Sequence, residues 1–276
     1  MVWHAQLDLR YCLEQGRTVA RHRHIGPLRV LQSLYPEGNA VCHNVLVHPP
    51  GGLVGGDTLT LNVNAEGGSH GLLTTPGASR FYRSEGAWAH QQTHLKLDAG
   101  ARLEWLPQEA ICYDGCKAHN QITLDLAPEA QCLAWDVTAL GLPAAQLPFA
   151  RGELLQDIHL PGVWVERGHL RADDERLLNS PAGLDGMRCM ASLVWASGTA
   201  LSRTQKDALL DSARACWAEN PLAYRAGATS PHPQVVVVRV LADQVEPAMH
   251  LLRKIRTAWR NLMWATQGSE PRIWAM

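Results

Sequence analysis

The residues that point most directly to chemistry lie in the glycine-rich loop 48–57, which reads His-Pro-Pro-Gly-Gly-Leu-Val-Gly-Gly-Asp. Its glycines Gly51, Gly52, Gly55 and Gly56 indicate backbone with positive φ or the close approach of another group. Because N–H groups of such a loop can cradle a phosphate, the loop suggests a nucleotide site. Neither Gly-Lys-Ser/Thr nor Gly-x-Gly-x-x-Gly accompanies it, so both nucleotide fingerprints fail. A hydrolase or phosphate-handling enzyme that uses this loop is the alternative function, and a β-structured ligand-binding module is a third.

Two further groups of side chains resemble metal-binding patterns. Cys112 and Cys116, with His119 after them, have the spacing of half a zinc site, but no second ligand pair is evident. The stretch 21–24, Arg-His-Arg-His, has too few histidines for a metal-storage tract and is expected at a solvated edge or loop. Neither pattern predicts a permanent metal site.

The composition excludes several classes of protein. The 276 residues carry 25 Lys and Arg against 26 Asp and Glu, which excludes a polybasic nucleic-acid binder. No apolar run approaches the ~18 residues of a membrane span, and the first residues do not resemble a signal peptide. The seven cysteines have no regular spacing, so reduced thiols and a cytoplasmic location are expected. Ten Trp against two Phe favour protein partners.

The elements that must position these residues are predicted to be mainly β. Segments 59–64, 94–98 and 122–126 alternate apolar and polar residues, and each is followed by a turn and a second apolar strand. Leu72, Leu103 and Leu133 in the second strands recur at intervals of about 30 residues, which predicts stacked, solenoid-like β-layers. Ordinary meander hairpins are the alternative.

Helical patterns begin near Ser202. Ser202 and Gln205 have the spacing of a capping box at a helix start, and 234–241 is a β-branched run typical of a buried strand. A second helix is predicted from Pro247 to a stop at Gly268. The predicted fold is thus mainly β, with stacked and possibly solenoid-like layers over 1–201. A small C-terminal α/β portion with two helices, 202–276, completes a single domain.

Blocks along the whole chain resemble one known family. Segment 48–59 is followed at 72–84 by Leu-Leu-Thr-Thr-Pro-Gly-Ala-Ser-Arg-Phe-Tyr-Arg-Ser, and further matching blocks lie at 26–30, 35–38, 103–109 and 271–275. In this order they resemble the signature of the urease accessory proteins called UreD or UreH. Arg80 departs from the pattern, since the family usually has Lys there. Segment 141–149 also lacks an Arg and a Glu that are common in the family.

The resemblance implies a non-enzymatic, β-rich protein with a small helical portion. Members of this family form a scaffold with the accessory proteins UreF and UreG, and the assembly docks on apo-urease. UreG is the GTPase of the set, and the assembly delivers nickel to the urease active site as a metallocenter-assembly chaperone. One proposal for the family is that nickel passes through the interior of the UreD-type subunit. No cofactor is expected to be permanently bound, and Ni²⁺ is expected to bind transiently.

Candidate residues for partner docking or nickel transfer follow from the matching blocks and from donor chemistry. They are His48, Gly51, Gly52, Gly55, Gly56, Asp57, Thr74, Thr75, Gly77, Ser79, Arg80, Tyr82, Arg83, Glu109 and Glu166. Cys42, His43, His48 and Asp57 are candidate nickel ligands, although Cys42 and His43 are expected on opposite faces of a strand.

Three further expectations concern single side chains. Glu166 and the adjacent Arg167 are expected to form an ion pair or to belong to an interface. Glu166 is also a candidate for an interior pathway that carries a divalent ion. Trp274 and Trp88 are expected to be interface anchors, since a scaffold between large proteins should bury aromatic surface against its partners.

Overall fold

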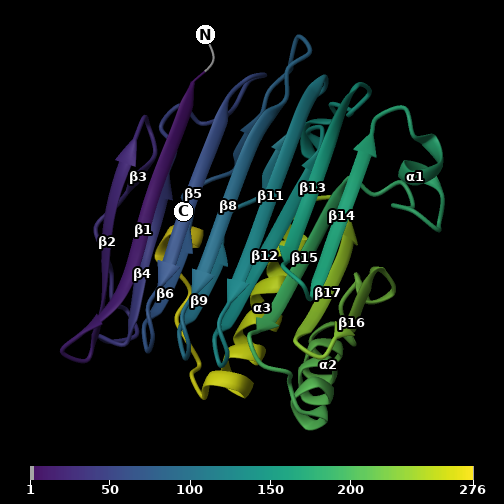
Figure 1. Ribbon diagram of the computed structural model, residues 1–276. Coiled ribbons are helices and arrows are strands. Elements are labelled where there is room, and N and C mark those ends of the chain that lie inside the picture. Colours follow the sequence, from purple (N-terminus) through teal and green to yellow (C-terminus); the bar gives the residue numbers. More distant parts are fainter. Residues whose placement is uncertain (1–2, 276) are drawn as a thin grey trace.

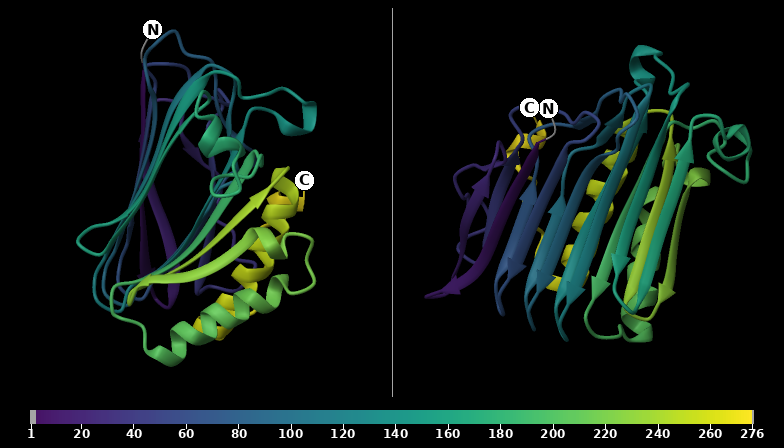
Figure 2. Two further views of the ribbon diagram at one scale, coloured as in Figure 1. Left: turned by 90° about the vertical axis from the view of Figure 1, so that its right-hand side faces the viewer. Right: turned by 45° about the horizontal axis from the view of Figure 1, so that its top comes forward.

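Two β-sheets pack face to face, and two long helices cover the far side of one of them (Figure 1). The structure is a computed structural model and describes residues 3–275. We call the seven-stranded sheet the outer sheet. The ten-stranded sheet is the central sheet, because it lies between the outer sheet and the helices (Figure 2). This arrangement has two apolar cores, one between the sheets and one under the helices.

The outer sheet has the order β14-β13-β11-β8-β5-β1-β2. Its strands are β1 (His4–Glu14), β2 (Arg17–Ile25), β5 (Thr58–Ala65), β8 (Ala89–Leu97), β11 (Cys116–Leu126), β13 (Gly152–Leu160) and β14 (Trp164–Arg171). The edge strand β2 carries the Arg-His-Arg-His stretch, whose residues are exposed as expected.

The central sheet has the order β16-β17-β15-β12-β9-β6-β4-β3. Its strands are β3 (Arg29–Val30), β4 (Val41–Val47), β6 (His70–Thr74), β9 (Arg102–Leu106), β12 (Gln131–Leu140), β15 (Cys189–Ser197), β16 (Ala226–His232) and β17 (Val235–Ala242). Two short strands are added beside β12: β10 (Ala110–Cys112) pairs with β12, and β7 (Ser79–Phe81) pairs with the other edge of β10.

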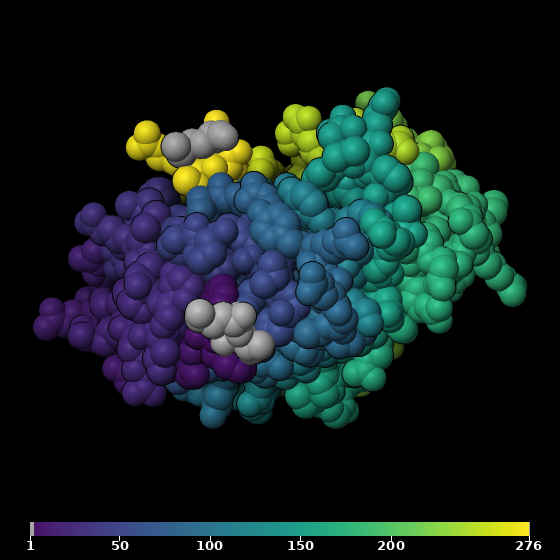
Figure 3. All heavy atoms as spheres, turned by 90° about the horizontal axis from the view of Figure 1, so that it is seen from above, coloured from purple at the N-terminus to yellow at the C-terminus, as the bar shows by residue number. Residues whose placement is uncertain are grey.

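The middle of the molecule is a stack of similar coils. Strands β5, β8 and β11 cross to β6, β9 and β12 through the short connections 66–69, 98–101 and 127–130. Each strand pairs in parallel with its equivalent in the next coil, as solenoid layers do. Seen from above, the colours run from purple to green along the stack, because the coils follow sequence order (Figure 3). The solenoid-like prediction is confirmed, and meander hairpins, which need antiparallel neighbours, do not form here.

The register differs from the leucine repeat by one residue. Leu72 and Leu133 both align with Glu104, whereas Leu103 aligns with Gly71 and Cys132. A shift of one residue turns a side chain to the other face. Leu72 and Leu133 therefore pack under the helices and Leu103 packs between the sheets, while Glu104 points toward the helices.

The C-terminal portion matches the predicted helices and extends the central sheet. Ser202 forms both hydrogen bonds of the capping box at the start of α2 (Arg203–Trp217). Helix α3 (Val245–Trp264) ends at a left-handed Ala265, so the predicted stop at Gly268 is wrong. The sequence did not predict β16, which pairs with β17, or the short helix α1 (Glu175–Asn179). Three 3-10 turns complete the elements: Pro143–Ala145, Ala223–Arg225 and Arg272–Ala275.

A buried ionic network fastens α3 to the central sheet. The Glu104 carboxylate accepts from Arg256 Nε at 2.8 Å and from His70 Nε2 at 3.1 Å. Arg260 donates to both oxygens of Glu37, at 3.0 and 2.6 Å, across 223 positions of sequence. Burial alone raises the pKa of Glu37, but the hydrogen bonds from His43 and Arg260 outweigh it and lower that pKa to about 2.

None of the helices over residues 3–275 is long and apolar enough to cross a membrane.

Candidate functional site

The two segments that sequence analysis singled out, 48–57 and 74–83, lie side by side. Leu53 N–H donates to Arg80 O at 2.7 Å, and Tyr82 N–H donates to Leu53 O at 2.8 Å. Leu53 thus pairs alongside β7 through an isolated parallel bridge to Phe81. The Leu53 and Phe81 side chains are both fully buried. The glycine-rich loop is therefore held by backbone pairing, and its position is set by the strand next to it.

The glycines are explained by turns and by close packing. Gly51 and Gly56 have φ of +76° and +98°, backbone angles that residues with a Cβ rarely adopt. A Cβ at Gly52 would lie 2.9 Å from Arg80 O and would overlap the Tyr82 ring, and a Cβ at Gly55 would lie 2.7 Å from Ala87 O. The four positions need glycine for the fold of the loop.

The loop's N–H groups are largely used within the protein. Gly51 N–H donates to His48 O at 2.8 Å, Gly56 N–H donates to Trp88 O at 2.9 Å, and Val54 N–H donates to Asp57 Oδ2 at 3.0 Å. A phosphate cradle needs several N–H groups that converge on open space. The geometry therefore gives no support to a phosphate-handling loop.

A serine in a Gly-x-Ser-x-Gly context offers no nucleophile either. Ser69, in the run Gly-Gly-Ser-His-Gly, is 1% exposed, and its hydroxyl donates to Glu66 O at 2.6 Å. It lies in a strand–turn–strand connection, whereas a nucleophile elbow joins a strand to a helix. Ser69 therefore gives no support to the hydrolase alternative.

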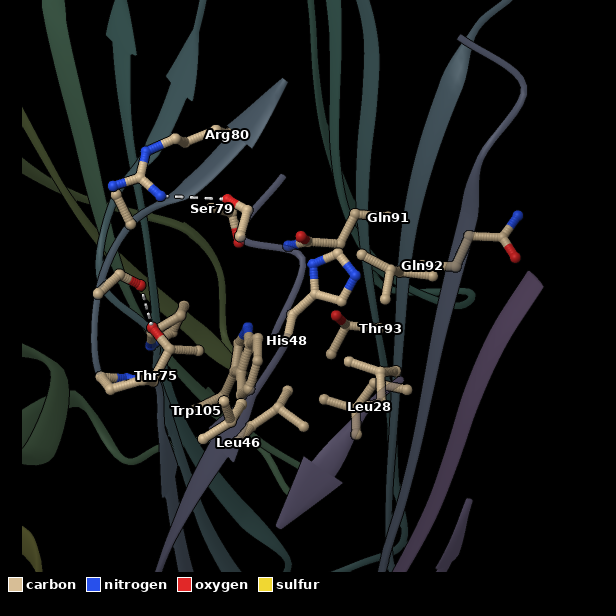
Figure 4. Close-up of a pocket in the computed structure, with 18 residues that line it drawn as sticks. Leu28, Leu46, His48, Thr75, Ser79, Arg80, Gln91, Gln92, Thr93 and Trp105 are labelled. Carbon is tan, nitrogen blue, oxygen red and sulfur yellow. Dashed lines mark hydrogen bonds between the residues drawn. The ribbon is translucent and has the colours of Figure 1, made fainter. Parts of the chain in front are cut away.

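A cavity of about 180 Å³ opens where the two segments meet the inner faces of the sheets (Figure 4). Of the candidate residues, those that line it are His48, Gly51, Thr75, Gly77, Ser79 and Arg80. Arg80 Nη1 donates to Gly51 O at 3.3 Å and holds one wall. Gln91 and Thr93 of β8 line the opposite side, and Leu46 and Trp105 lie at the apolar end.

His48 and Asp57 carry buried atoms that have no hydrogen-bond partner among residues 3–275. His48 Nε2 and Asp57 Oδ1 are both unpaired, and Asp57 is 1% exposed. Burial lowers the pKa of His48, and the nearby Asp57 carboxylate offsets part of that effect. A neutral imidazole nitrogen and a carboxylate oxygen are both ligands of divalent metals, so these two residues are suited to receive a cation.

The other two candidate nickel ligands lie elsewhere. Cys42 lies in the core between the sheets and donates to Asn44 Oδ1, whereas His43 lies on the opposite face with Glu37 at 2.7 Å. Their opposite orientation is confirmed, and it separates them as ligands. No group of three or more Cys, His, Asp or Glu among residues 3–275 is placed to hold a metal ion.

Several candidate residues lie outside the cavity. Thr74 is buried on the helix side, where its hydroxyl accepts from Trp274 Nε1 at 2.8 Å. Trp274 is therefore a core residue, and its expected role as an interface anchor is wrong. The other expected anchor, Trp88, is half-buried beside Lys117. Glu109 contributes its backbone oxygen, which accepts from Ser79 N–H at 2.9 Å.

Tyr82 and Arg83 border a neighbouring surface groove. The groove is also lined by Tyr113, Leu142 and Leu147, and Leu147 is 56% exposed. Arg83 is exposed, whereas Tyr82 is half-buried against Gly52 and Tyr113.

Sequence analysis missed a line of polar side chains between the sheets. Gln91 Nε2 donates to Asn120 Oδ1 at 3.3 Å, and Asn120 Nδ2 donates to Asp136 Oδ2 at 3.1 Å. Gln156 Nε2 donates to the same Asp136 oxygen at 2.7 Å. Burial raises the pKa of Asp136 to about 6, although both amide donors act to lower it. The one sequence feature that points to this line is Asp136 itself, a charged residue in the otherwise mostly apolar run 133–140.

Glu166 stands at the far end of this line. It accepts from Arg239 Nε at 2.8 Å, and its charge adds to the rise in the Asp136 pKa. Arg167 points to the opposite face of β14 and pairs with Asp157. The expected Glu166–Arg167 ion pair is therefore wrong, because adjacent residues of a strand face opposite sides.

Comparison with known proteins decides the family. A family model described as UreD urease accessory protein matches residues 4–275. The chain belongs to the UreD family. It is 60% identical over 275 residues to the urease accessory protein UreD of Variovorax paradoxus (strain S110), covering 100% of both chains. It is 59% identical to the UreD proteins of Polaromonas sp. (strain JS666 / ATCC BAA-500) and Paracidovorax citrulli (strain AAC00-1), each over 276 residues and 100% of both chains. These relatives support the UreD resemblance along the whole chain.

Proposed function

We propose that this UreD-family protein is a non-enzymatic cytoplasmic scaffold for urease maturation. It would join apo-urease to the accessory proteins UreF and UreG and assist delivery of Ni²⁺ to the urease active site. Membership of an accessory-protein family supports a role in maturation rather than in urea hydrolysis itself. The absence of a usable phosphate cradle in loop 48–57 is in keeping with a scaffold that leaves nucleotide chemistry to UreG.

The observation that carries the proposal is the polar line through an otherwise apolar sandwich. Polar side chains are rarely placed between two packed sheets, because each must be desolvated and then paired. Here they run from His48 at the cavity, which has Asp57 nearby, through Gln91 and Asp136 toward Glu166. A line of oxygen and nitrogen donors is what an ion needs if it is to pass between β-sheets.

The donors in this line suit brief binding. Asn, Gln and Thr offer single neutral oxygens, and Asp136 has a pKa near 6, so a proton competes with a metal ion for its carboxylate. No three strong ligands converge among the described residues, so the ion would not be trapped. We propose that Ni²⁺ passes through as cargo and that no cofactor is permanently bound.

The direct test is a nickel-dependent urease co-expressed with its complete accessory set, with and without this protein. We expect urease activity and urease-bound nickel to depend on its presence. Pull-down of apo-urease, UreF and UreG on the tagged chain tests the scaffold role separately. Full nickel loading of urease in its absence would refute the proposal.

A narrower test uses Asp57→Asn, which keeps an acceptor for Val54 N–H but removes the charge. We expect less nickel in urease while the complex with the partners still assembles. Asp125→Asn is the matched control, because Asp125 is an exposed carboxylate on the outer sheet. Unchanged nickel loading with Asp57→Asn would remove Asp57 from the path.

A further inference from the structure

A second group of side chains with metal-ligand chemistry lies on the solvent-facing side of the outer sheet, on the opposite face of the strands that carry the interior line. Helices α2 and α3 cover the central sheet, so this face carries no helix over the described residues (Figure 2). One row of directly opposed residues crosses it, from β1 to β14: His4, Thr58, His90, His119, Leu155 and His169. Two histidines, His90 and His119, are nearest neighbours in this row.

The His90 and His119 rings are close enough to share an ion. They stand on adjacent parallel strands, and their ring centroids are 5.4 Å apart. A metal about 2.1 Å from one nitrogen of each ring, with a bond angle between tetrahedral and square, requires centroids about 4.5–5.2 Å apart. Small side-chain rotations close that difference, because both residues are only partly buried.

His119 is already oriented as metal-binding histidines are. Its Nε2 lies 2.9 Å from Asp157 Oδ2, and a carboxylate can only accept, so Nε2 carries a proton and Nδ1 is the nitrogen that a metal ion would take. A carboxylate that holds the other nitrogen of a ligating histidine is a general feature of metal sites. Asp157 is held in turn by Arg167 through its second oxygen.

We propose that His90 and His119 form a binding site for a divalent transition-metal cation on the outer sheet, with Asp157 as the positioning residue for His119. Two imidazole nitrogens favour Ni²⁺, Cu²⁺ or Zn²⁺ over Mg²⁺ or Ca²⁺, which prefer oxygen ligands. No third Cys, His, Asp or Glu in residues 3–275 completes the shell, so the remaining positions are open to water. The site also accounts for the sequence pattern around Cys112: the two cysteines are buried inside, while His119 points outward to His90.

The test measures metal binding to the purified full-length chain without partner proteins. Titration calorimetry with Ni²⁺, and electron paramagnetic resonance with one equivalent of Cu²⁺, compare the wild type with His90→Ala, His119→Ala and Asp157→Asn. His159→Ala is the matched control, since His159 lies on the same face opposite Val165. Circular dichroism and thermal unfolding establish that each variant is folded.

We expect His90→Ala and His119→Ala each to remove one binding event and the two-nitrogen Cu²⁺ signal. Asp157→Asn should weaken Ni²⁺ binding about tenfold, and His159→Ala should change neither readout. Binding that survives either His→Ala substitution overturns the proposal, as does a loss that His159→Ala reproduces. The site does not rest on the proposed function, because the isolated chain is measured and urease activation is not.

Discussion

Asp136 is the residue whose replacement most clearly separates stability from function. It is 4% exposed between the sheets, and burial raises its pKa from 3.8 to about 6. Replacing it with Asn removes the charge and keeps nearly the same shape. An amide oxygen in the place of Asp136 Oδ2 can still accept from both Asn120 Nδ2 and Gln156 Nε2, so these two hydrogen bonds can be kept.

The sign of the effect follows from the two pKa values. Between pH of about 4 and 6 the folded protein keeps a proton on Asp136 that the unfolded chain has lost, so stability falls as pH rises through this window. Above pH 6 the cost of ionising Asp136 in the folded state is fully present. A shift from 3.8 to about 6 corresponds to about 3 kcal/mol at pH 7.

We therefore expect Asp136→Asn to raise the free energy of unfolding by up to about 3 kcal/mol at pH 7, with little change at pH 4. Urea unfolding of the isolated chain at several pH values measures the difference, and Asp125→Asn is the exposed control. If the proposed nickel path is right, the same variant should deliver less nickel to urease, because the path loses its buried carboxylate. A variant that is no more stable at pH 7, or a difference that does not change with pH, would refute the reasoning.

Three further predictions concern the framework, and each is measured by urea or thermal unfolding. Glu104→Ala should lower the free energy of unfolding by about 3–5 kcal/mol, because buried Arg256 loses its carboxylate partner. The control Glu153→Ala breaks only the partly exposed pairs with Lys117 and His169, so it should lower the free energy of unfolding by less than about 1 kcal/mol. Equal effects would contradict this account of the network. Gly52→Ala should destabilise by about 1–3 kcal/mol, since its Cβ meets the Tyr82 ring and the Arg80 backbone, whereas Gly77→Ala, with open space at that position, should not. Ser202→Ala should cost about 1 kcal/mol through loss of the α2 cap, and an unchanged midpoint would rule out that role.

Strands and helices whose signals lie in neighbouring residues were predicted well from the sequence. Features that depend on pairing between distant strands were not. The alternation in 59–64 and the Ser202 capping box predicted β5 and α2, because both signals lie in a few neighbouring residues. The leucine repeat predicted stacked coils but missed the true register, which backbone pairing between coils decides. Strand β16 was missed because its Gly, Ser and Pro residues are typical of loops, and only pairing with β17 makes them a strand.

The candidate site was predicted in part for the same reason. His48 and the segment 74–83 were found through glycine spacing and family resemblance, and pairing with β7 brings them together. The polar line was missed because Gln91, Asn120 and Gln156 come from three strands and are ordinary residues in the sequence. Only the packing of the two sheets shows that they lie next to Asp136.

The network that fastens α3 has a consequence for synthesis on the ribosome. Glu37 and Glu104 are made early, yet their arginine partners lie in α3, near the end of the chain. Until α3 emerges, the nascent coils carry two carboxylates that lack their arginine partners, and an apolar sheet face that lacks its cover. Folding to the native state must therefore wait for the last part of translation, and we expect a chain that stops before α3 to be degraded by proteases.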